Sequence, residues 1–228
     1  MGEWTKVKAE DGHELSAYIA SPTGEPIGAL VLIQEIFGVN AHIRGVADGF
    51  ARDGFQVIAP ALFDRIECGV ELKYDAEDGK RGFELMYKLD LDKAVMDVAA
   101  AYFLAKKTDR GIGVVGYCFG GLLSWLTATR GETVKMQPSC CIGYYPGGIG
   151  KFAGEEPSCP VMLHFGGNDT HIGMDQVEAV RTAHPEVEIY VYDNAGHGFS
   201  CDARVDFYAP AAALARERTL SFLKTHVA

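Results

Sequence analysis

Three residues of reactive type stand in short glycine-rich stretches, each following an apolar run. Cys118 lies in GYCFGG, Asp169 in GGND and His197 in GHGF. A thiolate attacks carbonyl carbon, an imidazole takes and returns a proton, and a carboxylate on the other ring nitrogen fixes the imidazole. Taken singly, a buried cysteine, a turn aspartate and a structural histidine are ordinary. Their joint occurrence, in this order and each at the end of an expected strand, predicts a catalytic triad with sulfur as the nucleophile.

The stretch around Cys118 has the G-x-C-x-G form of a nucleophile elbow, with cysteine in the place where serine is commoner. Gly116 and Gly120 are small enough to let the preceding strand and the following helix approach closely. The start of that helix directs free N–H groups at the sulfur and at an oxyanion formed beside it. The backbone N–H of Phe119 is therefore one expected half of an oxyanion hole.

Glu35 closes the apolar run 29–34 and is expected at the same edge of the sheet as Cys118. Two interpretations stay open for it. Its carboxylate is either solvated, as charged side chains at strand ends mostly are, or it meets the Cys118 thiol. The backbone N–H of Ile36 is the expected second donor of the oxyanion hole.

These residues need a scaffold that brings strand ends together, and the hydrophobic pattern supplies one. Apolar runs alternate with helical periods, which predicts an α/β fold with a mostly parallel central sheet and helices on both faces. Residues 61–90 lack a clean period and are expected to form an excursion of loops and short helices over the site. We expect one domain over residues 1–228. Strands are predicted at 29–34, 56–59, 112–115, 140–144, 161–165 and 187–192, after a hairpin at 4–20, and helices from 41, at 92–107, 119–129, 174–183 and 207–225.

Composition excludes several classes of function. The chain has 228 residues and a net charge of -10, which disfavours nucleic acid as a partner. It has no apolar run of membrane-span length, and its first residues lack the pattern of a secretory signal, so a cytoplasmic location is expected. The six cysteines show no metal-ligand spacing and are expected as reduced thiols. The stretch GIGVVG (111–116) lies along a strand, which argues against a dinucleotide cofactor.

Four separated stretches together resemble the dienelactone hydrolase family, the carboxymethylenebutenolidases of the α/β-hydrolase fold. They are QEIFGVN (34–40), GYCFGG (116–121), GGND (166–169) and GHGF (196–199). The resemblance implies a triad of Cys118, Asp169 and His197, with Glu35 taking up or releasing the thiol proton. It implies hydrolysis of a small lactone or ester through a cysteine acyl-enzyme, with no cofactor or metal.

The expected substrate contacts depart from the family pattern. The family typically has an arginine four residues after the histidine, where this chain has Cys201. Arg204 and Arg81 are the candidates to hold a substrate carboxylate, and the change at Cys201 favours a lactone or ester other than dienelactone. Six aromatic residues are candidates for the pocket wall, although each is also compatible with the core: Phe37, Phe83, Tyr87, Tyr144, Tyr145 and Phe199.

Two alternatives to a hydrolase remain. One is a catalytically silent ligand-binding protein on the same fold, because fold does not fix function. The other is a redox-sensing thiol, which requires an exposed thiolate near a resolving cysteine. A small-molecule lactone or ester is the expected partner, and a monomer is favoured.

Overall fold

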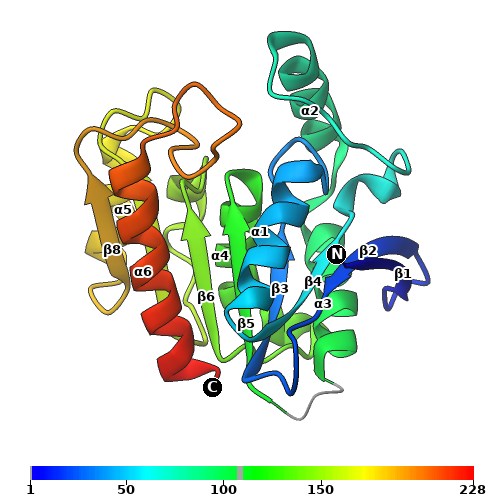
Figure 1. Ribbon diagram of the computed structural model, residues 1–228. Coiled ribbons are helices and arrows are strands. Elements are labelled where there is room, and N and C mark those ends of the chain that lie inside the picture. Colours follow the sequence, from blue (N-terminus) through cyan, green and yellow to red (C-terminus); the bar gives the residue numbers. More distant parts are fainter. Residues whose placement is uncertain (1, 107–109) are drawn as a thin grey trace.

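The computed structural model describes residues 2–106 and 110–228, which form an eight-stranded sheet covered by helices (Figure 1). The strand order is β1-β2-β4-β3-β5-β6-β7-β8. The β1–β2 and β2–β4 pairs are antiparallel, and the five other pairs are parallel. The strands are β1 (Glu3–Lys8), β2 (Glu14–Ala20), β3 (Gly28–Ile33), β4 (Phe55–Pro60), β5 (Ile112–Tyr117), β6 (Cys140–Tyr144), β7 (Val161–Gly166) and β8 (Glu188–Tyr192).

Helices cover both faces of the sheet, as the apolar strands require. Every residue of β3, β5, β6 and β7 is buried, because each of these strands is packed on both faces. Figure 1 shows α1 and α6 in front of the sheet and α3 and α4 behind it. The α-helices are α1 (Ala41–Arg52), α2 (Ala76–Lys88), α3 (Leu91–Ala105), α4 (Phe119–Arg130), α5 (Met174–Ala183) and α6 (Ala209–His226). The expected α/β-hydrolase layout is confirmed.

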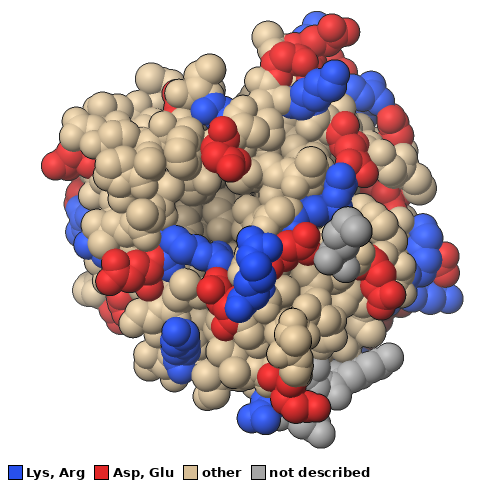
Figure 2. Space-filling view, viewed as in Figure 1, with Lys and Arg blue, Asp and Glu red and all other residues tan. Residues whose placement is uncertain are grey.

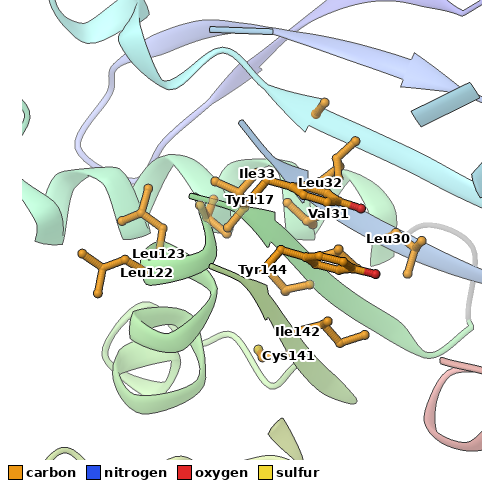
Figure 3. Close-up of a cluster of buried hydrophobic side chains, with 14 of the residues drawn as sticks. Leu30, Val31, Leu32, Ile33, Tyr117, Leu122, Leu123, Cys141, Ile142 and Tyr144 are labelled. Carbon is orange, nitrogen blue, oxygen red and sulfur yellow. The ribbon is translucent and has the colours of Figure 1, made fainter. Parts of the chain in front are cut away.

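Buried apolar side chains of β3, β5, β6 and α4 form part of the hydrophobic core (Figure 3). The four residues 30–33 of β3 have no exposed surface. On β5 and β6, the rings of Tyr117 and Tyr144 stack with their centres 4.5 Å apart. Two neighbouring strands are thus fixed to one another directly before the elbow at Cys118.

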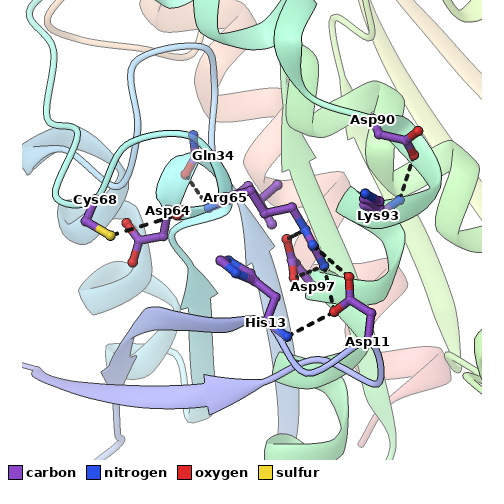
Figure 4. A network of polar contacts seen from close by, with 10 residues as sticks. Asp11, His13, Gln34, Asp64, Arg65, Cys68, Asp90, Lys93 and Asp97 are labelled. Atoms are coloured by element: carbon purple, nitrogen blue, oxygen red, sulfur yellow. Dashed lines mark hydrogen bonds and ion pairs between the residues drawn. The ribbon is translucent and has the colours of Figure 1, made fainter.

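The excursion between β4 and α3 starts from a firmly held base. It contains a short 3-10 helix, η1 (Leu62–Arg65), and then α2, which projects beyond the end of the sheet (Figure 1). Arg65 donates from Nε to Asp97 Oδ2 at 2.6 Å and from Nη1 to Asp11 Oδ2 at 2.8 Å (Figure 4). Burial raises the pKa of Asp97 to about 6, while the hydrogen bond from Arg65 acts to lower it. A single arginine therefore joins η1 to the hairpin turn and to α3.

Basic and acidic side chains are interspersed over the face shown in Figure 2. Among residues 2–106 and 110–228, none of the helices combines the length and apolar character that a membrane span requires.

Candidate active site

Cys118 occupies a strained turn between β5 and α4. Its backbone angles are φ 54° and ψ -116°, in the region where a residue with a side chain is rare. A side-chain carbon on Gly116 would collide with the carbonyl oxygen of Gly120, and one on Gly120 would collide with the carbonyl of Ile33. The glycines on either side are thus required by the close approach of strand and helix, as the sequence predicts. Such strain is typical of functional sites.

The three reactive residues meet in one chain of contacts. His197 Nε2 lies 3.2 Å from Cys118 Sγ, and His197 Nδ1 lies 2.8 Å from Asp169 Oδ2. The other carboxylate oxygen, Asp169 Oδ1, accepts the backbone N–H of His171 at 2.8 Å and that of Ile172 at 3.1 Å. The aspartate is therefore oriented by its own loop, and it orients the imidazole in turn.

The surroundings of His197 favour its protonated form. Burial acts to lower its pKa, but the negative charge of Cys118 and the hydrogen bond to Asp169 outweigh burial and raise the pKa of His197 to about 10. For Asp169, burial acts to raise the pKa, and the contact with His197 outweighs it, so the pKa of Asp169 lies below its usual value. The arrangement is suited to a thiolate and imidazolium pair supported by a carboxylate.

Glu35 differs from both expectations for it. The residue has no exposed surface, so the solvated interpretation is wrong. Its Oε2 accepts a hydrogen bond from the Tyr74 hydroxyl at 2.9 Å, and its Oε1 lies 3.5 Å from Arg204 Nη1. Within the described residues, no hydrogen bond joins Glu35 to Cys118. The carboxylate is held by a tyrosine from the excursion and an arginine from the loop after β8.

A cavity of about 640 Å³ opens onto the triad. Polar side chains of its lining are those of Cys118, His197, His171, Arg204, Lys151 and Asp75. Much of the apolar lining comes from α2 and the residues that follow it. The apolar lining comprises Ile36, Phe37, Phe83, Met86, Leu89, Leu91, Phe119, Leu122 and Phe152, with Tyr74 and Tyr87 among the lining aromatics. Residues of the excursion therefore supply part of the cavity lining.

The expected oxyanion-hole residues, Ile36 and Phe119, line this cavity, as do three of the expected substrate contacts: Phe37, Tyr87 and Arg204. Their roles in catalysis or binding remain predictions. Phe83, a further candidate for the wall, lines the cavity as well.

The other expected contacts lie elsewhere. Arg81 is half-exposed on α2 and pairs with Glu67 at 2.5 Å, outside the cavity lining. Phe199 has no exposed surface, and the hydroxyl of Tyr144 lies 2.6 Å from Thr219 Oγ1, so both aromatic rings belong to the core. Tyr144 instead borders a second cavity of about 460 Å³ between α1 and α6, where Figure 2 shows the surface hollowed.

Arg204 reaches the cavity because the loop after His197 folds back on itself. The N–H of Cys201 donates to the carbonyl of Gly198 at 2.9 Å, and the N–H of Arg204 donates to that of Cys201 at 3.1 Å. Gly198 has φ 79°, and a side-chain carbon there would lie 2.7 Å from the Arg204 guanidinium. Gly198 thus permits both the turn and the passage of the arginine. Burial acts to lower the pKa of Arg204, but Glu35 and Cys118 outweigh it and raise that pKa.

Two residues of this site are absent from the sequence predictions. Tyr74 lies in the excursion, where no periodic pattern indicates which way a side chain points. His171 stands with its ring centre 5.0 Å from that of His197. Its place two residues after Asp169 is the signal that would have indicated it.

The chain is similar to known proteins along nearly its whole length. The model of the dienelactone hydrolase family matches residues 15–227. The chain belongs to the dienelactone hydrolase family. A carboxymethylenebutenolidase of Pseudomonas putida is 31% identical over 98% of this chain and 96% of its own length, and one of Pseudomonas knackmussii gives the same values.

Solved structures show the shared fold. A Klebsiella pneumoniae protein solved as a candidate dienelactone hydrolase has a TM-score of 0.81 at 26% identity, over 97% of this chain and 98% of its own. A dienelactone hydrolase-like promiscuous phosphotriesterase from metagenomic libraries has a TM-score of 0.79 at 17% identity, over 100% of this chain and 99% of its own, and this likeness shows the fold alone. As a member of the dienelactone hydrolase family, this protein is a carboxylic ester hydrolase.

Proposed function

We propose that this dienelactone hydrolase family member cleaves a small lactone or ester through an acyl-enzyme on Cys118. The observation that carries the proposal is the continuous contact from Cys118 Sγ through His197 to Asp169, at 3.2 Å and 2.8 Å. These are the contacts that an activated sulfur nucleophile requires. The sulfur also borders a cavity that admits a substrate.

In the acylation step, the thiol proton passes to His197 and the thiolate attacks the carbonyl carbon of the substrate. The backbone N–H groups of Ile36 and Phe119 hold the oxyanion. The carbon–oxygen bond to the leaving group then breaks, and the imidazolium returns its proton to the departing oxygen. In a lactone that oxygen stays on the acyl chain, so the ring opens while the acyl group remains bound to sulfur.

Hydrolysis of the thioester completes the cycle. Water attacks the acyl carbon, His197 takes the water proton, and the thiolate leaves and is protonated again. Glu35 is assigned the role of a second acceptor for the thiol proton when substrate enters. A substrate anion that approaches Arg204 would compete for the guanidinium that now lies 3.5 Å from the Glu35 carboxylate, which frees this carboxylate to accept a proton.

The lining of the cavity indicates the class of substrate. Arg204 is a partly buried cation that lines the cavity together with the nucleophile, and it is suited to a carboxylate on the acyl part. Apolar side chains of α2 and Leu122 also line the cavity, and the volume of about 640 Å³ is that of a site for a drug-sized ligand. We therefore assign to the substrate a carboxylate on its acyl part and an extended apolar group.

The test is a rapid-mixing experiment with an activated aryl ester. We expect a burst of one aryl alcohol per active site, with the acyl mass located on Cys118 by peptide mass spectrometry. Cys118→Ala should give neither burst nor adduct, and His197→Ala should lose turnover. A wild-type protein with no burst and no turnover across a panel of lactones and esters would be a ligand-binding member of the fold. A reversible Cys118 disulfide after mild peroxide would instead support the redox interpretation.

A further inference from the structure

A second group of chemically reactive side chains lies behind the wall of the cavity. Glu35 follows β3, His42 lies in the first turn of α1, and Cys201 is in the loop after β8. A carboxylate oxygen, a ring nitrogen and Sγ of these residues all lie within 4.8 Å of one another. Three separate elements therefore converge on one point, which spacing along the chain does not reveal.

His42 carries a nitrogen that lacks a partner. Its Nδ1 lies 3.3 Å from Asp202 Oδ1, so Nδ1 carries the proton and donates it to this carboxylate. The other nitrogen, Nε2, then presents a lone pair. The side chain is only 9% exposed, and Nε2 is buried with no hydrogen-bond partner within residues 2–106 and 110–228. A buried acceptor without a donor costs about 1–3 kcal/mol and requires an explanation.

A metal ion would give His42 Nε2 the partner that it lacks. Histidine ligands of metals usually donate the second ring N–H to a carboxylate, which fixes the tautomer and the ring orientation. Asp202 stands in that place. The carboxylate of Glu35 retains lone pairs beyond those that accept from Tyr74 and face Arg204.

The ligand types select the kind of ion. A nitrogen, a sulfur and a carboxylate oxygen suit Zn²⁺, whereas Mg²⁺ and Ca²⁺ prefer oxygen ligands alone. Ligand atoms at zinc bond lengths lie roughly 3.3–3.6 Å apart in a tetrahedral site. The ligand atoms of the three side chains lie within 4.8 Å of one another, so the distances between them must shorten by about 1 Å when the ion binds. Small changes of the side-chain torsion angles are sufficient for this.

We propose that Glu35, His42 and Cys201 form a binding site for Zn²⁺ or a similar divalent transition metal, with Asp202 orienting His42. On binding, the Cys201 S–H bond breaks, an S–Zn bond forms and the proton leaves to solvent. The carboxylate and the thiolate neutralise the ion, so Arg204 faces a cluster without net positive charge. A fourth ligand, such as a water molecule, would complete a tetrahedral site.

Occupancy of this site has a consequence that rests on the proposed function. An ion bound to the Glu35 carboxylate would prevent Glu35 from accepting the thiol proton. Zn²⁺ is therefore expected to slow hydrolysis, and a chelator is expected to restore it. Metal binding itself does not depend on whether Glu35 serves in hydrolysis.

The catalytic pair of Cys118 and His197 is a competing zinc site, so the experiment uses Cys118→Ala as the background. Co²⁺ is titrated into this variant, and the near-ultraviolet absorption of a cobalt–thiolate bond is recorded. We expect one equivalent to bind, and Zn²⁺ to displace it. Cys201→Ser in the same background should abolish the absorption, and His42→Ala should weaken binding at least tenfold.

Asp202→Ala removes this acceptor and is expected to leave the fold intact, because the side chain of Asp202 is 78% exposed. It should lower the affinity for Co²⁺ about 10-fold to 100-fold, as loss of an outer hydrogen bond to a metal ligand does. The proposal is overturned if Cys118→Ala binds no Co²⁺, or if the absorption survives in Cys201→Ser. Because the readout is binding to a variant without its nucleophile, it stands even if the hydrolysis tests fail.

Discussion

Arg204→Met tests whether this arginine recognises a substrate carboxylate. The guanidinium lies in the cavity beside the nucleophile, with only 16% of the side chain exposed. A hydrogen bond between charged groups contributes about 1.5–3 kcal/mol. Since each 1.36 kcal/mol changes a rate tenfold, we expect kcat/KM for a substrate with a carboxylate to fall by about 10-fold to 150-fold.

The assay compares two aryl esters that share a leaving group. One acyl chain ends in a carboxylate and the other in the primary amide of the same shape. Arg204→Met should lower kcat/KM for the acid by the full factor and for the amide by far less. Arg204→Lys, which keeps the charge and loses the planar fork, should give an intermediate value for the acid.

The ratio of the two esters separates recognition from a structural effect. Loss of Arg204 also leaves the buried Glu35 with one partner fewer, which is expected to lower the melting temperature. Such damage affects both esters alike and cancels in the ratio. An equal loss for acid and amide would refute the reasoning and would limit Arg204 to the role of partner to Glu35.

Three further predictions concern the charge of the triad, the base of the excursion and the apolar wall. Cys118→Ala removes the main negative neighbour of His197, so the pKa of this histidine should fall well below the native value of about 10, as a titration of its ring signals by NMR would show. Arg65→Met leaves Asp97 buried without its cation and should lower the free energy of unfolding by about 3–5 kcal/mol in urea titrations. Phe83→Ala trims the wall and should lower kcat/KM for esters with a large apolar group by about five-fold, roughly 1 kcal/mol, with little effect on small esters.

The sheet could be predicted from the sequence because its strands are signalled by local pattern. Strands such as β3 and β5 are buried along their whole length and carry no charged side chain, since both faces of each are covered. The carboxyl ends of parallel strands then share one edge, so Asp169 and His197 could be placed together before any contact was known. The predicted placement of these two residues depends on topology alone. In the structure, His197 Nδ1 lies 2.8 Å from Asp169 Oδ2.

Side-chain direction at the strand ends could not be predicted in the same way. Tyr144 is the last residue of β6, yet its hydroxyl lies 2.6 Å from Thr219 Oγ1 on α6, and it does not line the cavity at the triad. Arg81 lies in the expected excursion, on α2, but its guanidinium turns to Glu67. The alternation of residues along a strand predicts the face of the sheet from which a side chain projects. The contacts that the side chain finally makes depend on neighbours that are distant in the sequence.

The loop from His197 to Arg204 shows why distance along the chain is a weak guide to distance in space. The family resemblance implies an arginine four residues after His197, and this chain has Cys201 there. Two successive turns after Gly198 bring the residue seven positions on, Arg204, to the Glu35 carboxylate instead. The same turns place Cys201 beside Glu35 and His42. The conformation of this one loop therefore both keeps a cation at the cavity and assembles the proposed ion site.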